Sequence, residues 1–199
     1  MESLSTRTTL LSLIRDPSDH AAWREFEKRY CELLVRFCRG RGLQLTDAED
    51  VVQSVFASLS QSLPQFVYDP RRGRFRDYLF RCSRNAIFRW AQRPGGQDRR
   101  LDTSVASSLP NLGEPSTDEA ALWDDEWVDH HYRLAMNTLR KNTDVRNVEI
   151  FERLVAGDTV VNVAARFDVT PDAVHKVKQR LRDRMQELIA AQIAEEDAE

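Results

Sequence analysis

The sequence lacks most of the features that mark a secreted, membrane-bound or metal-dependent protein. Its three cysteines, Cys31, Cys38 and Cys82, are odd in number and never form a CxxC pair. Neither a disulfide framework nor a zinc site is therefore expected, and we interpret all three as small buried hydrophobic residues. No apolar run approaches the roughly 20 residues that cross a bilayer, and the N-terminus has no cleavable leader pattern. These absences predict a cytoplasmic protein that makes no membrane contact.

Motifs for catalysis and cofactor binding are missing as well. The four histidines form no HExxH or HxH pattern, and the chain contains no GxSxG, GxxxxGK or GxGxxG sequence. We therefore expect no enzyme activity, no cofactor and no metal site.

Charge is present in abundance, and it is unevenly distributed. The formal net charge of the 199 residues is -3, yet residues 71 to 100 carry ten Lys or Arg against two acids, and residues 101 to 145 carry three against nine. Such blocks indicate binding partners better than the net charge does. The closing stretch "AEEDAE" is acidic and is expected to be disordered, solvating charge.

Apolar residues recur at helical spacing almost throughout, and no stretch alternates as a strand would. The pattern predicts an all-α fold of two small helical domains joined by a flexible acidic linker. We place the domains at 8–95 and 123–192, and the linker at 96–122, where serine, glycine, proline and acids dominate. The first long helix has a stripe that ends at "GRG", residues 40–42, and consists of Trp23, Phe26, Tyr30, Leu33 and Phe37.

The second helix is predicted to begin with a capping box made by Thr46 and Glu49. Its inner face contains Ala48, Val52, Val55 and Leu59. The opposite face is expected to show polar side chains to solvent or to a partner, namely Asp47, Asp50, Gln53 and Ser54.

A third helix is predicted from about Phe75 to Gln92, after a turn-rich loop, and it is both cationic and aromatic. Its inner stripe is expected to contain Phe75, Leu79, Cys82 and Ala86, which leaves the arginines outside. Arginines and aromatic rings together suit single-stranded nucleic acid, because bases stack on rings while the phosphates need positive charge. The alternative is that the rings mostly belong to the core.

The last two predicted helices, 159–167 and 171–193, have the form of a helix-turn-helix. Asp168 is expected to adopt the left-handed conformation in the turn, and Thr170 to cap the second helix. The outer face of that helix would lie in a DNA major groove. The alternative is an ordinary solvated helix in an interaction domain.

These segments together resemble a known family. "DAEDVVQSVF", "YDPRRGRFRDYLFRCSRNAIFRW" and "VAGDTVVNVAARFDVTPDAVHKVKQRLRDRM" are similar to the two conserved-region blocks of an extracytoplasmic-function sigma factor of bacterial RNA polymerase, in the right order. The stretch "TLLSLIRDPSDHAAWREFEKRY" is similar to the start of planctomycete-type members.

The resemblance implies three sets of binding residues and their partners. The beta-prime clamp helices of the polymerase core would contact Asp47, Asp50, Gln53 and Ser54. The minus-10 element of promoter DNA would contact the loop 65–74 and the residues Arg74, Arg76, Arg81, Arg84, Asn85 and Arg89. The minus-35 element would contact a domain docked near the beta flap, through Thr170, Asp172, His175, Lys176, Gln179 and Arg182. An anti-sigma factor is a further candidate partner.

Two other classes of function compete with this interpretation. A stand-alone helix-turn-helix regulator would bind duplex DNA without polymerase and would need a dimer surface or a sensing domain, but the sequence shows neither a phosphoacceptor-type α/β domain nor a ligand-pocket signature. A purely protein-binding helical adaptor would leave the cationic third helix unexplained.

Overall fold

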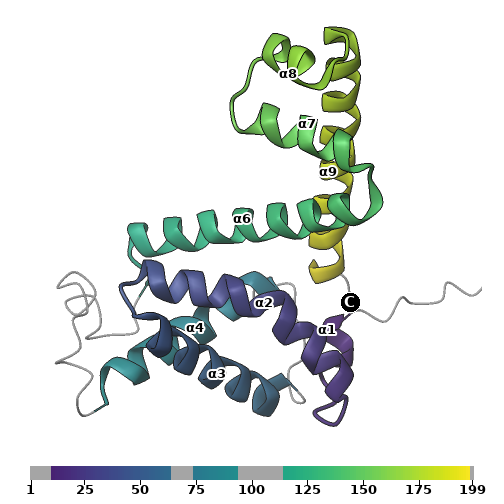
Figure 1. Cartoon of the computed structure of the whole chain (residues 1–199). Helices are drawn as coiled ribbons and strands as arrows, with labels where there is room; N and C mark the ends of the chain where they lie inside the picture. Colours follow the sequence, from purple (N-terminus) through teal and green to yellow (C-terminus); the bar gives the residue numbers. More distant parts are fainter. Residues whose placement is uncertain (1–9, 64–73, 94–113, 198–199) are drawn as a thin grey trace, which may run out of the picture. The chain divides into compact units, whose positions relative to one another are not determined.

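The structure is a computed structural model that describes residues 10–63, 74–93 and 114–197, and these residues form helices and no strands. The all-α prediction is thus confirmed for them. The helices are α1 (Leu10–Leu13), α2 (His20–Gly40), α3 (Leu45–Ser62), α4 (Phe75–Ala91), α6 (Thr117–Asn142), α7 (Val145–Val155), α8 (Val160–Phe167) and α9 (Pro171–Asp197) (Figure 1). Among the described helices, none is both long and apolar enough to span a membrane.

The chain divides into two compact units, which we describe separately. The first unit extends to Val128 and includes the end of the chain from Glu195, and the second unit comprises residues 129–194. Residues 65–73 of the predicted loop and most of the predicted linker lie outside the described residues.

The core of the first unit is built on the aromatic stripe of α2. Its five predicted members are all buried, and the inner face of α3 is buried against them as predicted. Ring contacts connect the elements, since Phe26 lies 6.0 Å from Phe56 of α3 and 6.0 Å from Phe75 of α4, measured between ring centroids. A 3.6-residue period puts this stripe on one side of α2, so α3 and α4 both pack against that side.

The start of α3 differs from the prediction. The N-cap residue is Gln44, which makes no side-chain capping bond, so the predicted capping box of Thr46 and Glu49 is wrong. Because the helix begins two residues early, Asp47 lies in its first turn and is buried, with an exposed fraction of 6%. Asp47 therefore does not share the solvent-exposed face on which we placed it.

The inner face of α4 also needs correction. Phe75, Leu79 and Ala86 are buried as predicted, but Ser83 is fully buried whereas Cys82 is only half-buried. The hydroxyl of Ser83 donates to the backbone oxygen of Leu79 at 2.8 Å, which satisfies its polar group inside the core. Cys31 is exposed, so of the three cysteines only Cys38 is fully buried as predicted.

Helix α6 begins at Thr117, inside the predicted linker, and its first half belongs to the first unit. Trp123, which we assigned to the second domain, is buried in the first unit. The centre of its ring lies 5.0 Å from that of Phe37, and it stacks on Phe80 with ring centroids 5.2 Å apart. A Cβ atom added at Gly40 would meet the side chain of Leu122 at 2.9 Å. Gly40, the last residue of α2, thus permits a close approach of α6.

The second unit contains the predicted helix-turn-helix, formed by α8 and α9 (Figure 1). Ile150 of α7 joins six apolar residues of the helix-turn-helix in its core: Val163, Ala164, Phe167, Val169, Val174 and Val177. Asp168 has the predicted left-handed conformation, with φ 48°. The hydroxyl of Thr170 accepts from the backbone amide of Ala173 at 3.2 Å, as its predicted capping role requires.

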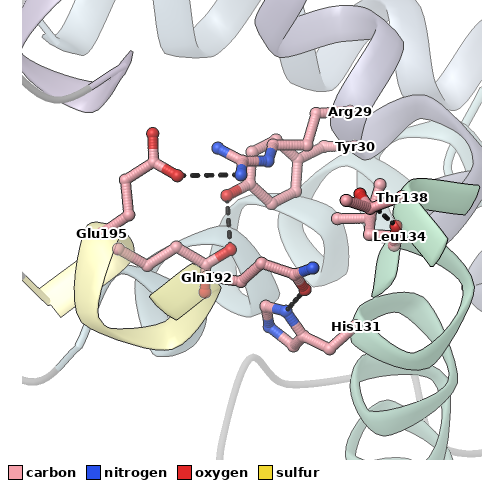
Figure 2. A network of polar contacts seen from close by, with 8 residues as sticks. Arg29, Tyr30, His131, Leu134, Thr138, Gln192 and Glu195 are labelled. Carbon is pink, nitrogen blue, oxygen red and sulfur yellow. Dashed lines mark hydrogen bonds and ion pairs between the residues drawn. The ribbon is translucent and has the colours of Figure 1, made fainter. Parts of the chain in front are cut away.

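The acidic end of the chain is ordered as far as the structure describes it. In the last turn of α9, Glu195 accepts a hydrogen bond from Arg29 at 2.9 Å (Figure 2). Tyr30 donates its hydroxyl proton to the buried carboxylate of Glu196 at 2.6 Å. Burial, with this carboxylate adding to it, raises the pKa of Tyr30 well above its usual value. The prediction of a disordered tail is wrong for these two residues.

Replacing Asp168 tests the left-handed turn of the second unit. Glycine adopts positive φ without a steric penalty, whereas alanine lacks the local hydrogen-bonding group that makes Asp tolerable there. We expect Asp168→Ala to destabilise the α8–α9 pair by about 1 kcal/mol relative to Asp168→Gly. Hydrogen exchange of peptides from α8 and α9 should then be roughly fivefold faster in the alanine variant. Asn162→Ala, at an exposed helical position of α8, is the control. Equal exchange in the glycine and alanine variants would contradict the argument.

Candidate nucleic-acid interface

The outer face of α4 presents three of the residues that sequence analysis selected. Arg81, Asn85 and Arg89 follow one another at four-residue spacing, so they share one side of the helix, and all three are exposed. Arg89 donates to the hydroxyl of Ser58 in α3 at 3.2 Å. The structure therefore brings together two cations and an amide on one accessible face, a combination that can contact phosphates and base edges.

Two other predicted residues of α4 do not belong to this face. Arg84 is paired with Glu119 at 3.0 Å, and its side chain is only 14% exposed. Arg76 forms an ion pair with Asp124, and its side chain is 30% exposed. Both acids come from the first half of α6, which sequence analysis had placed in the linker or the second domain. Both side chains are thus partly buried and paired with acids, and their contact with the minus-10 element stays a prediction.

The remaining minus-10 candidate, Arg74, is exposed at the N-terminus of α4. Its backbone amide donates to the carboxylate of Asp77 at 3.1 Å, which satisfies one of the amides left open at a helix start. The loop that precedes Arg74 lies outside the described residues.

The aromatic rings of α4 mostly belong to the core, which resolves an alternative that the sequence left open. Phe75 and Trp90 are buried, and Phe80 and Phe88 are half-buried. Tyr78 is half-buried, and its hydroxyl lies 2.7 Å from that of Ser62. The rings therefore hold α4 in place, and the exposed face offers charge and hydrogen bonds rather than stacking surfaces.

On α3, the predicted protein-binding face is reduced to its central part. Asp50 and Gln53 are exposed, and Ser54 is half-buried with its hydroxyl bonded to the backbone oxygen of Asp50 at 3.0 Å. Asp47 is buried and drops out of the set.

A groove of about 1080 Å³ lies beside these residues, between α2 and α3. Its apolar lining includes Trp23, Val52 and Phe56, and its polar lining includes Gln53 together with charged side chains of α2 such as Arg24 and Lys28. Sequence analysis missed the contribution of α2, because the spacing of residues within each helix says nothing about which helices lie side by side. An apolar floor with a charged rim is suited to a partner helix.

In the second unit, all six residues selected on and before α9 are exposed: Thr170, Asp172, His175, Lys176, Gln179 and Arg182. Neighbouring side chains orient the amide of Gln179. Its nitrogen donates to the carboxylate of Asp183 at 2.9 Å, and its oxygen accepts from Arg182 at 2.9 Å. The amide is thus held in one orientation along the helix surface.

Sequence analysis missed a pair of buried histidines in the second unit. His130 and His131 of α6 are each 2% exposed, with ring centroids 5.4 Å apart. The Nδ1 atom of His131 lies 2.9 Å from the side-chain oxygen of Gln192 (Figure 2). Within the described parts of the chain, no cluster of three or more histidine, cysteine or acidic side chains could hold a metal ion.

Comparison with known proteins assigns a class to part of the first unit. Residues 28–95, which include most of α2 and all of α3 and α4, match the family model described as Sigma-70 region 2. That segment is therefore similar to sigma-70 region 2, and the exposed faces of α3 and α4 lie within it. The second unit lies outside the match.

The other comparisons add little to this class. No curated protein matches the chain. A solved structure described as "Structure of CnrH in complex with the cytosolic domain of CnrY" is 22% identical, over 92% of this chain and 96% of that chain, with a TM-score of 0.36. At this TM-score the similarity supports no further conclusion.

The cysteines allow a test of how the first unit is packed around the groove. Cys31 lines the groove and is exposed, whereas burial raises the pKa of Cys38 to about 12. Partial burial and the nearby carboxylate of Glu27 raise the pKa of Cys31 as well. We nevertheless expect iodoacetamide at about pH 8 to alkylate Cys31 at least roughly tenfold faster than Cys38, because alkylation needs both thiolate and access.

A mass-spectrometric time course on the native chain measures the two rates, and the urea-unfolded chain serves as the control, in which the difference should vanish. Equal rates in the native chain would contradict the packing of α2.

Proposed function

We propose that this protein is a sigma factor of bacterial RNA polymerase, of the extracytoplasmic-function type, that directs transcription initiation at promoters. The observation that carries the proposal is the match of residues 28–95 to Sigma-70 region 2. The helix-turn-helix of the second unit adds independent support, because a motif suited to duplex DNA follows the region 2 domain in the same chain. The protein would act in the cytoplasm, where its polymerase is.

In this proposal the α2–α3 groove and the exposed residues beside it bind the polymerase core. Asp50 and Gln53 would contact the beta-prime clamp helices, and the apolar floor with Trp23 and Phe56 would take up a side chain of that partner. Contacts at an apolar centre with a charged rim combine burial with orientation.

The exposed face of α4 would contact the minus-10 element. Arg81 and Arg89 would pair with phosphates, and Asn85 would contact a base edge, since an amide both donates and accepts hydrogen bonds. Arg74 would add a further phosphate contact at the start of the helix. The rings of α4 are buried or half-buried, so this face would act by charge and hydrogen bonding, and the polymerase would perform the synthesis.

The first turns of α9 would read the minus-35 element in the major groove while the second unit docks near the beta flap. Lys176 supplies phosphate attraction, and His175, Gln179 and Arg182 present donors and acceptors to base edges. An anti-sigma factor is the regulator that a protein of this type would need, and it would have to compete for the same exposed surfaces.

Reconstitution with core RNA polymerase on a promoter library tests the function directly. Arg81→Ala and Asn85→Ala should each lower the amount of open complex about tenfold, because one base or phosphate contact is worth about 1 to 3 kcal/mol. Binding to the core should be unchanged. Arg39→Ala, which removes an exposed arginine from the end of α2, is the matched control. Binding of duplex DNA by the chain alone, with no core binding and no transcript, would instead indicate a stand-alone regulator.

The groove gives a second, separate prediction. Core polymerase should protect Cys31 from alkylation, because a helix in the groove would cover its thiol. Asp50→Arg should weaken core binding roughly tenfold and remove that protection at limiting polymerase, since it reverses a charge at the interface. Asp125→Arg makes the same reversal at an exposed position of α6 and should leave protection intact. Full alkylation of Cys31 in a stable complex would place the core-binding surface elsewhere.

A further inference from the structure

The first half of α6 places acidic side chains against arginines of the first unit. Three carboxylates of this segment form ion pairs that connect it to α2, to the residue after α2 and to α4: Glu119 with Arg41 and Arg84, Asp124 with Arg76, and Glu126 with Arg36. Two further acids of the same segment, Asp118 and Asp125, are exposed. The acidic character of α6 is therefore divided between a face that pairs with arginines and a face that is open to solvent.

Glu119 is at the centre of this contact. One carboxylate oxygen lies 3.0 Å from Nε of Arg84, and the other lies 3.4 Å from a terminal nitrogen of Arg41. The three side chains are only 7%, 14% and 11% exposed, respectively. The guanidinium of Arg84 also lies 5.7 Å from the centre of the Phe80 ring, which helps to orient it. Two oriented guanidinium groups around one anion would equally suit a phosphate group.

The contact is held in place by aromatic packing one turn further along α6. Trp123 is buried between Phe37 and Phe80, while Glu119 lies in the first turn of the helix. The amide of Glu119 donates to the hydroxyl of Ser116 at 3.2 Å, so a side chain caps this first turn. Release of Glu119 from the arginines requires rotation of its side chain or opening of this one turn, and either change can leave Trp123 buried.

The ion pair of Asp124 with Arg76 is more accessible. The side chain of Asp124 is 65% exposed and that of Arg76 is 30% exposed, and the guanidinium of Arg76 lies 5.7 Å from the centre of the Trp127 ring. Because water already reaches this pair, another anion can replace the carboxylate without any change in the helix.

We propose that the acidic face of α6 competes with DNA for arginines of the same chain. Glu119 pairs with Arg84 and Arg41, and Asp124 pairs with Arg76. When these carboxylates are displaced, the arginines bind DNA phosphates. The inference rests on the proposed function, because it assumes that α4 meets DNA. A DNA phosphate and a carboxylate of α6 bind the same guanidinium groups. The arginines on this edge of α4 can therefore contact DNA only after their ion pairs with α6 have broken. Nonspecific binding by the free chain is thereby suppressed.

The test measures binding of a fluorescent mixed-sequence single-stranded oligonucleotide to the full chain by anisotropy, over a range of salt concentrations. Glu119→Gln and Asp124→Asn should each tighten binding roughly three- to tenfold. The slope of log affinity against log salt should steepen by about 0.7 for each arginine that gains a phosphate contact. Asp118→Asn and Asp125→Asn remove the same charge from neighbouring exposed positions, so they correct for the change in net charge.

A double variant distinguishes release of Arg84 from a general effect of the lost negative charge on DNA binding. Adding Arg84→Ala to Glu119→Gln should abolish the gain, because the released arginine is then missing. If Glu119→Gln impairs folding, as thermal unfolding would show, the Asp124→Asn variant, at an exposed side chain, decides between the two outcomes. Binding by both variants that is no tighter than that of their matched controls would overturn the inference.

The outcome is distinguishable from a failure of the proposed function. Loss of promoter opening in the Arg81 and Asn85 variants without any gain in the Glu119 and Asp124 variants would overturn the competition and leave the sigma function in place. A gain in oligonucleotide binding that depends on Arg84, in a chain that supports no polymerase-dependent transcript, would support the competition and remove the sigma function.

Discussion

The aromatic stripe of α2 is the interaction on which the rest of the first unit depends. Phe26 contacts rings of both α3 and α4, and Phe37 contacts Trp123 of α6. One face of α2 therefore fixes the positions of α3, α4 and the first half of α6. Burying large rings on one stripe removes apolar area from water and restricts how the neighbours can rotate. The outer faces of α3 and α4 are therefore presented in defined directions, and the groove between α2 and α3 exists because these helices are spaced by their rings.

The same packing determines which arginines are exposed. Because Trp123 stacks on Phe80, the acidic side of α6 lies along one edge of α4, where Glu119 meets Arg84 and Asp124 meets Arg76. Arg81, Asn85 and Arg89 point away from that edge and remain exposed. A chain with net negative charge thus keeps one cationic face open and neutralises another with its own carboxylates.

Much of the helical framework was predictable from local patterns. The stripe of α2, the inner face of α3 and the helix-turn-helix with its left-handed Asp168 were all predicted correctly, because periodicity and turn chemistry are local properties. The start of α3 was not, since the helix begins at Leu45 and its N-cap residue is Gln44, which makes no side-chain capping bond. The outer face of α4 was predicted only in part. A helical wheel shows which residues lie outside the buried stripe, but it does not show which of them are covered by a helix distant in sequence, here α6.

The sequence by itself determined the all-α class, the helix-turn-helix and the presence of a cationic segment in an acidic chain, since these follow from residue spacing and composition. Only the tertiary structure decided that Asp47 is buried, that Trp123 belongs to the first core and that Arg84 is paired with Glu119. The physical reason is the range of the interactions. Capping, periodicity and turns act within a few residues, whereas burial and ion pairing between α4 and α6 join residues 35 positions apart in the chain and depend on how complete helices pack.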